Sequence, residues 1–570
     1  MRQSYRDQTQ TTRGMMDRRK PSAIVAMALR GAVLAVAATP ALAQAQQTTG
    51  AGEPETRAVS QGPAAVTPPD GTRPAEQSAA EPAQPATLAP VEGTATPLPP
   101  VAPAATVTVQ PTKPVALQDA ASRPAEPAAS DSWFARPPLT ATVGLGAKKL
   151  SVTLYGFFEV DAIHDSTRSY GDAIGPSLVA RTDTFDSKTG RTQFSMRNTR
   201  LGLAFQSAIA AGLKTSAVFE GDFFGNQPAE PPTSTETAYF DSPTFRLRHA
   251  YVKLENNYVD VLAGQTYDLF GWQNYFFPMS AEFLGLPNML FSRHAQVRLS
   301  HTFGADGPIG VDVAAAMLRP AQRDSEIPDT NAGLRFSVNG WKGITTPGNV
   351  GTTALPLSIG VSSVFRQFKA NAYTPPPVQS SNSLTGWGLS VDALLPVIPA
   401  ADSDDRGNRL TLTGSFVTGT GIADLITANG GAVFPTLPNP AQSPSPPVYT
   451  ANIDNGLVTF DINGVMHTID WRAFKAGLQY YLPPSGRVAL ALNYTQAESK
   501  NMAALFPVGA FENGLIVKIA KTSRYADANL FWDVTPAVRV GASVQYSQVE
   551  YLDGNKPHNL REMAQALYIF

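Results

Sequence analysis

The feature that most constrains this chain is a series of short segments after residue 148 in which apolar and polar residues alternate. Such alternation gives a β-strand one apolar and one polar face, because successive side chains point to opposite sides. About sixteen of these segments follow one another, and most are near the ~9–11 residues that a tilted strand needs to cross a bilayer. The pattern predicts an all-β fold, a transmembrane up-and-down antiparallel β-barrel of about sixteen strands.

The connections between these segments alternate in length. Asn256–Asn257 is a tight turn, whereas Phe270–His294 is a long loop, and the same contrast recurs along the chain. Short turns at one end and long loops at the other are typical of outer-membrane barrels, whose short turns face the periplasm. A soluble stack of sheets would instead need polar outer faces. Two connections, 341–354 and 398–408, are longer than a short turn, so the strand ends are least defined there.

The last segment, Leu560–Phe570, has the character of a closing strand. Ala566, Tyr568 and Phe570 fall on one face, and Arg561 falls on the other. Aromatic residues collect at the membrane boundaries of such barrels. Tyr568 and Phe570 also resemble the signal that the bacterial outer-membrane assembly machinery reads. This machinery and outer-membrane lipid are therefore expected partners.

Upstream of the barrel, residues 1–43 have the pattern of a signal peptide. A basic start is followed by the apolar stretch Ala23–Ala38 and by an A-x-A cleavage site at 41–43. Residues 44–147 are rich in Pro and Ala, a composition that cannot bury enough apolar surface to fold. We expect a disordered periplasmic tether over 44–147 and a barrel over 148–570 in the outer membrane of a Gram-negative bacterium. The chain has no Cys, so neither disulfides nor a lipid-modified Cys is expected.

The polar strand faces carry many basic side chains. Val297 and Leu299 take the lipid face of their strand, which turns Arg298 inward. The predicted pore-lining residues are Arg197, Arg200, Arg246, Arg248, Arg298, Arg335, Arg366, Lys475 and Arg539. Two interpretations stay open. The guanidinium groups attract carboxylate solutes, or they pair with inward acids and stiffen the wall.

The long loop over 271–288 is unusually aromatic for a loop facing outside water. Folding it into the lumen would bury the aromatic side chains and narrow the pore. The predicted constriction loop consists of Trp272, Tyr275, Phe276, Phe277 and Glu282, with the Glu282 carboxylate facing the basic wall. The alternative is that these aromatic residues pack against a neighbouring subunit.

Three stretches carry a family resemblance: Leu154–Phe157, Arg246–Val252 and Leu262–Thr266. They resemble the DcaP-like trimeric porins, and more loosely the general Gram-negative porins, over residues from about 148 to 570. The resemblance implies a homotrimeric channel of sixteen-stranded barrels that admits small anions such as dicarboxylates. In the family archetype a coiled-coil segment precedes the barrel, whereas this chain has the Pro-rich segment there.

These inferences favour an outer-membrane porin that lets small hydrophilic solutes diffuse passively and prefers anions. Two alternatives stay open: a non-selective structural barrel whose tether contacts the cell wall, and an outer-membrane enzyme. An enzyme is disfavoured because Ser300 and His301 are neighbours on a strand and point to opposite faces. The sequence suggests no cofactor, no metal site and no nucleic-acid partner.

Overall fold

The chain divides into two units, Met1–Leu98 and Pro99–Phe570, and every residue that the structure describes lies in the second. The computed structural model describes residues 108–109, 134, 139–145, 148–174, 178–208, 213–225, 244–274, 277–282, 285–322, 325–349, 351–371, 381–429, 456–460, 466–505 and 519–570. The predicted signal peptide and most of the predicted tether therefore lie outside the described residues.

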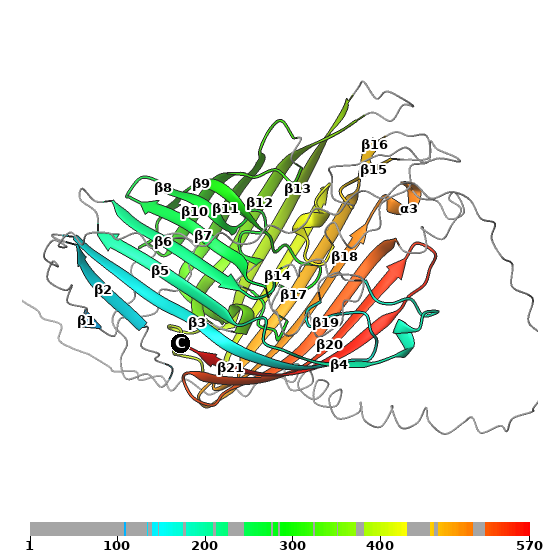
Figure 1. Cartoon of the computed structure of the whole chain (residues 1–570). Coiled ribbons are helices and arrows are strands. Elements are labelled where there is room, and N and C mark those ends of the chain that lie inside the picture. The colour runs from blue at the N-terminus through cyan, green and yellow to red at the C-terminus, as the bar shows by residue number, and fades with distance from the viewer. Residues whose placement is uncertain are drawn as a thin grey trace, which may run out of the picture. The chain divides into compact units, whose positions relative to one another are not determined.

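The second unit consists mainly of β-strands that pair antiparallel with their neighbours (Figure 1). The strands are β1 (Thr108–Val109), β2 (Leu139–Leu145), β3 (Lys148–Asp165), β4 (Arg191–Ser195), β5 (Arg200–Ala208), β6 (Lys214–Asp222), β7 (Arg246–Glu255), β8 (Asp260–Tyr267), β9 (Arg293–Phe303), β10 (Ile309–Leu318), β11 (Asp329–Thr345), β12 (Thr353–Asn371), β13 (Ser381–Ile398), β14 (Arg409–Thr420), β15 (Val458–Phe460), β16 (Met466–Thr468), β17 (Asp470–Tyr481), β18 (Val488–Ser499), β19 (Ala520–Asp533), β20 (Val538–Tyr551) and β21 (His558–Ile569). The short helices are η1 (Asp186–Lys188), η4 (Pro347–Asn349), η5 (Ala423–Leu425) and α3 (Met502–Leu505). Among the described residues, no helix has the length and apolar character needed to cross a membrane.

The barrel wall has sixteen positions. β4 and β5 share one position beside β3, β15 and β16 form a separate small sheet, and the short strands β1 and β2 are an addition to the first half of β3. Residues 196–199 separate the two halves of that shared strand. β21 pairs with β3 from Ile569↔Phe157 to Arg561↔Asp165, which closes the barrel. A closed ladder leaves no open strand edge in the membrane. The predicted fold, a closed antiparallel barrel of sixteen strands, is confirmed.

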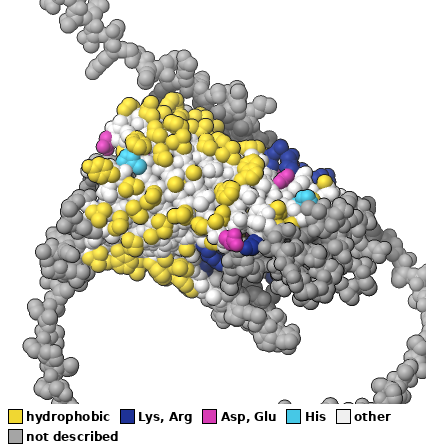
Figure 2. All heavy atoms as spheres, turned by 90° about the horizontal axis from the view of Figure 1, so that it is seen from above, with side chains coloured by type: hydrophobic (Ala, Val, Ile, Leu, Met, Phe, Trp, Pro, Cys, Tyr) yellow, Lys and Arg dark blue, Asp and Glu magenta, His cyan; other side chains and the backbone are white. Residues whose placement is uncertain are grey.

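The outer face of the wall is apolar. Val297 and Leu299 are 47% and 50% exposed, whereas Arg298 between them is 3% exposed. Figure 2 shows hydrophobic side chains gathered over a broad face, with charged side chains along its margins. An exposed belt of this kind is stable only where lipid replaces water. Tyr568 belongs to the same outer face and is 53% exposed.

The interior is filled from the long-loop side. The β3–β4 loop (166–190), the β8–β9 loop (268–292) and residues 421–429 after β14 contribute to one buried hydrophobic cluster. Members of that cluster from these three stretches include Tyr170, Ile174, Phe270, Leu286, Leu290, Ile422 and Leu425. Apolar side chains of these loops therefore pack against the inner wall of the barrel.

The sequence left the strand ends poorly defined in two connections, 341–354 and 398–408. The structure places a bulge at the start of the first, and a hydrogen bond joins the two connections. β11 continues to Thr345, but its register to β12 shifts between Val338 and Lys342, so three residues leave the ladder. Ala400, in the β13–β14 connection, donates its N–H to the Lys342 carbonyl at 2.9 Å. A bulge reverses the alternation of faces, which hides the end of a strand from a period-two pattern.

Two short strands lie inside the segment predicted to be a disordered tether. β2 pairs with the first half of β3, from Leu139↔Leu154 onward, close to where Phe570 exchanges backbone hydrogen bonds with Gly156. The ring of Phe134 has its centroid 3.7 Å from the Arg406 guanidinium carbon. The boundary placed at residue 147 is therefore too late for these residues. The rest of the predicted tether lies outside the described residues.

Candidate functional site: the interior of the barrel

All nine basic residues predicted to line the pore lie on the inner side of the wall, where they are buried or half-buried. Seven of them lie within ion-pair distance of a carboxylate. The pairs are Arg197 with Asp172 (3.0 Å), Arg200 with Glu220 (3.6 Å), Arg246 with Asp222 (2.6 Å), Arg248 with Glu220 (2.7 Å) and Asp222 (3.0 Å), Arg335 with Asp312 (2.6 Å), Arg366 with Asp329 (2.8 Å) and Asp424 (2.5 Å), and Arg539 with Asp533 (2.6 Å). Most of the predicted basic residues therefore also stiffen the wall.

Arg298 and Lys475 differ from the other seven. In the part of the chain that the structure describes, both side chains bind uncharged acceptors, and no carboxylate oxygen lies within ion-pair distance of either. Arg298 donates from Nε to Gln296 Oε1 at 3.1 Å and from Nη2 to the Tyr267 carbonyl. Lys475 donates to Thr413 Oγ1 at 3.1 Å and lies 5.0 Å from the centroid of the Phe277 ring. Neither side chain therefore forms an ion pair with a described carboxylate.

Six arginines gather on one part of the wall, on or beside strands β4 to β9. They are Arg197, Arg200, Arg246, Arg248, Arg293 and Arg298. The first four of them pair with the carboxylates Asp172, Glu220 and Asp222. Aromatic rings support four of the six guanidinium groups: Phe224 lies under Arg197 and Arg246, Phe157 under Arg200, and Tyr267 and Phe291 under Arg293. A guanidinium group that lies over the face of a ring leaves the N–H groups at its own edge available to an oxyanion.

Two nitrogen donors of this arginine cluster make no hydrogen bond to a described residue, although one of them, Arg200 Nε, lies 3.6 Å from Glu220 Oε1. Arg293 Nη1 and Arg200 Nε are buried and have no hydrogen-bond partner among the described residues. Arg293 was not among the predicted pore-lining residues, because it begins its strand and no alternating pattern precedes it. Buried donors without partners are costly, so a solute oxyanion or water is expected to complete them.

The β8–β9 loop enters the barrel and packs against its inner wall. Trp272 is buried against Ala314 and Ala316 of β10. It also contacts Gly333 of β11, where a Cβ atom would come within 2.9 Å of the Trp272 ring. Burying a large aromatic side chain contributes roughly 1.5–3 kcal/mol, which favours the inward position. Small residues on the facing strands thus make room for the loop.

Further along the β8–β9 loop, polar contacts attach its backbone to more distant strands. Phe277 is buried against Leu355 and Leu394, and its carbonyl accepts a hydrogen bond from Gln479 of β17. Ser280 Oγ donates to Asp527 Oδ2 at 2.7 Å on β19. Trp272 and Phe277 therefore contact their own barrel wall, whereas the alternative placed them against a neighbouring subunit. Tyr275 and Phe276 lie outside the described residues.

Glu282 does not face the basic wall that was expected for it. Its Oε2 atom lies 3.5 Å from Arg561 Nη1 on the closing strand, and its Oε1 atom accepts the Ile174 N–H at 3.3 Å. Burial raises the pKa of Glu282 to about 7, with Asp161 and Asp165 adding to the rise and Arg561 opposing it. The charged groups around Glu282 come from β3 and β21, which meet only where the barrel closes. The alternating pattern of a single strand does not predict this contact.

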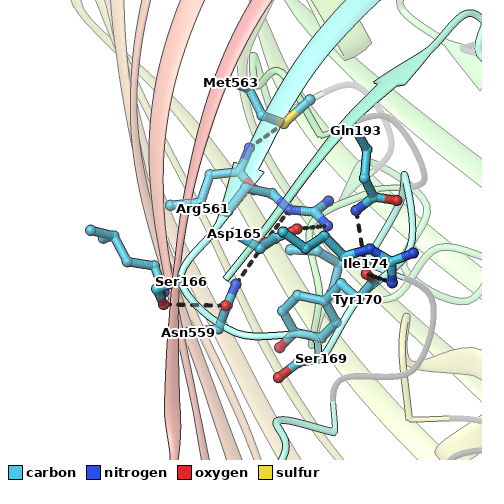
Figure 3. Close-up of polar contacts among 12 residues, drawn as sticks. Asp165, Ser166, Ser169, Tyr170, Ile174, Gln193, Asn559, Arg561 and Met563 are labelled. Atoms are coloured by element: carbon cyan, nitrogen blue, oxygen red, sulfur yellow. Dashed lines mark hydrogen bonds and ion pairs between the residues drawn. The ribbon is translucent and has the colours of Figure 1, made fainter. Parts of the chain in front are cut away.

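Arg561 is the centre of a polar network at that seam (Figure 3). It binds Asp165 of β3 through two hydrogen bonds of 2.9 Å each, and it donates to the Gly171 carbonyl of the β3–β4 loop at 2.6 Å. Tyr170 presents its ring to the guanidinium group at 5.4 Å. The sequence placed Arg561 on the inward face, but its partners come from residues almost four hundred positions earlier in the chain.

Residues 421–429 form a second inward segment that the sequence did not predict. Arg366, which is fully buried, donates to Asp424 at 2.5 and 2.7 Å and to the Gly421 carbonyl at 3.0 Å. The segment pairs with the end of the β8–β9 loop, because Thr427 donates its N–H to the Met289 carbonyl at 2.7 Å. Arg366 therefore binds residues 421–429 directly, and these residues in turn bind the end of the β8–β9 loop.

No group of three or more His, Asp or Glu side chains among the described residues is arranged to hold a metal ion. His249 lies 3.9 Å from Glu220, and His294 lies 2.8 Å from Asp268. The described interior combines charged and aromatic side chains.

The closed wall, the apolar outer belt and the charged interior define a channel-type barrel of the outer membrane. A model of the Gram-negative porin family matches residues 116–391. The fold is similar to the crystal structure of the outer membrane channel DcaP of Acinetobacter baumannii, with 17% identity, a TM-score of 0.50 and coverage of 74% of this chain and 97% of that chain.

Two further solved structures are similar more distantly. One is the trimer form of in-vitro folded OmpT, an outer membrane protein of Vibrio cholerae, with 10% identity, a TM-score of 0.40 and coverage of 74% and 99%. The other is the high pH structure of Pseudomonas putida OprB, with 12% identity, a TM-score of 0.40 and coverage of 73% and 94%. No curated protein sequence matches the chain. The family match and the fold confirm the porin resemblance seen in the motifs of the chain.

Proposed function

We propose that this porin passes small hydrophilic solutes by passive diffusion and favours anions such as dicarboxylates. The observation that carries the anion preference is the arginine cluster on β4 to β9, in which three carboxylates pair with four of the six guanidinium groups. Diffusion through a channel of this kind is selected by width and by the charge of the lining.

The expected size of the charge effect follows from Coulomb's law. At an effective dielectric constant of about 20 and a separation of about 7 Å, one unpaired positive charge attracts a monovalent anion by roughly 2 kcal/mol. Two such charges, Arg293 and Arg298, lie on the same strand. A dicarboxylate, with two negative charges, is attracted about twice as strongly by each positive charge, before the cost of its partial dehydration. The preference should weaken as salt rises, because the screening length falls below about 10 Å above 0.1 M.

The test is the reversal potential of single channels in a salt gradient. The double variant Arg293→Gln/Arg298→Gln removes the two arginines of the cluster without carboxylate partners, so we expect the reversal potential to move toward that of a cation-selective channel. The matched control is Arg472→Gln, which makes the same change at a side chain that is 45% exposed. An equal reversal potential in the double variant and the parent protein would refute the anion preference and favour a non-selective barrel.

Several further proposals rest on the sequence. Residues 1–43 are a cleaved signal peptide, and the segment upstream of β2 extends into the periplasm. Three copies associate as a homotrimer, and the outer-membrane assembly machinery recognises Tyr568 and Phe570. Phe570 packs on Phe158, with ring centroids 5.3 Å apart, which ties the proposed signal to the closing seam.

A further inference from the structure

Two loops that enter the barrel from different points of the chain meet at one carboxylate and one guanidinium group. Glu282 belongs to the β8–β9 loop, and its Oε1 atom accepts the N–H of Ile174 in the β3–β4 loop at 3.3 Å. Arg561 on β21 donates to the Gly171 carbonyl of the same β3–β4 loop at 2.6 Å. The Glu282–Arg561 contact therefore joins both inward loops to the seam where the barrel closes.

The contact between the two charged groups is incomplete. Arg561 Nη1 and Glu282 Oε2 are 3.5 Å apart, and neither atom has a hydrogen-bond partner among the described residues. Arg561 is already engaged by Asp165 through two hydrogen bonds. Glu282 is 4% exposed, so water does little to solvate its charge. One guanidinium group thus has to compensate two buried carboxylates.

The other ionisable groups near Glu282 are mostly acidic. Asp161 and Asp165 of β3 raise the free energy of its ionised form, and Arg561 is the cation that lowers it. On β19, Asp527 accepts a hydrogen bond from Ser280, two residues before Glu282. The Tyr525 hydroxyl donates to the same Asp527 carboxylate. Tyr170 of the β3–β4 loop covers Arg561 from the other side. Ionisation of Glu282 therefore places a net negative charge in a buried, acidic environment.

We propose that Glu282 and Arg561 are positioning residues that hold the two inward loops at the seam, and that the loops separate when Glu282 ionises. The proposal deepens the proposed channel function and rests on it. The sign follows from linkage. The inward position of the loop favours protonated Glu282. The stability of this position is therefore greatest below the ordinary carboxyl pKa of 4.5, and it is lost as pH rises to the raised pKa of about 7.

The magnitude follows from the same shift. Displacement of the loop returns Glu282 to water and to its ordinary pKa. Between about pH 4 and pH 8, the ratio of displaced to inward loop should therefore rise by roughly two hundredfold, because each unit of pKa difference is a factor of ten. The conductance of the channel, which the inward loops narrow, should rise with it.

The first measurement is single-channel conductance across this pH range in the full-length protein. We expect a step near neutral pH in the parent protein and no step in Glu282→Gln, whose side chain stays neutral. Arg561→Gln removes the compensating cation, so its step should move to higher pH. The matched control is Glu562→Gln, which changes an exposed acid on the outer face of the same strand and should leave the step in place.

The second measurement does not depend on conduction. The chain has no Cys, so Ala281→Cys provides a single thiol next to Glu282 at a fully buried position. Its labelling by a maleimide, measured relative to a free thiol at each pH, should rise as pH increases and should become independent of pH when Glu282→Gln is added.

The outcomes separate the two proposals. A protein that does not conduct at any pH contradicts the proposed channel function, while thiol labelling still tests the loop contact. A conducting protein whose conductance and labelling are independent of pH overturns the Glu282–Arg561 proposal alone. A step that persists in Glu282→Gln also overturns it, because another group would then be responsible.

Discussion

Replacing Arg366 with Met should release residues 421–429 from the barrel wall. The Arg366 side chain is completely buried and is held by Asp329 at 2.8 Å and by Asp424 at 2.5 Å. A Met side chain of similar length keeps the apolar contacts of the stem but leaves two carboxylates without their cation. Removing one partner of a buried ion pair typically costs about 3–5 kcal/mol.

Most of that cost is relieved when the segment leaves the wall, since Asp424 then reaches water. We therefore expect the equilibrium for local opening of residues 421–429 to shift by about 3 kcal/mol, a factor of roughly a hundred in the open population. Global stability should fall less than local stability, because the barrel strands keep their backbone hydrogen bonds.

Local opening is measured with a single engineered thiol. Leu425 is 3% exposed, so Leu425→Cys should react slowly with a maleimide when Arg366 is intact and much faster in Arg366→Met. Lys369→Met is the control, because Lys369 lies on the same strand but its pair with Glu326 is largely exposed. Neutralising both acids in addition, as Asp329→Asn/Asp424→Asn, should restore slow labelling. Equal labelling rates with and without Arg366 would show that the guanidinium group does not hold the segment.

Two further predictions concern the ends of the barrel. Limited proteolysis should trim the chain only up to about residue 133, because Phe134 packs on Arg406 and β2 is paired with β3; mass spectrometry of a retained fragment that still contains the Pro-rich segment would contradict the proposed tether. Phe570→Ala should slow formation of the heat-modifiable barrel without changing the conductance of assembled channels, since the ring packs on Phe158 at the seam; an unchanged assembly rate would argue against its role as a signal.

The sequence determined the wall of this protein. Each strand that crosses the membrane must have one lipid-facing side, and this local requirement appears as alternation in any single segment. For that reason the inward orientation of Arg298 could be predicted from Val297 and Leu299 alone. The aromatic β8–β9 loop also revealed its inward position, because exposed Trp and Phe side chains are unfavourable in water. The bulge after Val338 marks the limit of this method, since it breaks the period on which the reasoning depends.

The tertiary structure decided what the inward charges do. Whether an arginine attracts solutes or stiffens the wall depends on which carboxylate lies opposite, and that follows from strand register, which alternation does not specify. Arg335 meets Asp312 across one ladder, whereas Arg561 meets Asp165 only because the last strand closes on the first barrel strand. Glu282 contacts Arg561 for the same reason, because its loop reaches the seam before it returns to β9. Contacts between residues so distant in sequence arise from closure of the barrel, a property of the whole chain that no single segment contains.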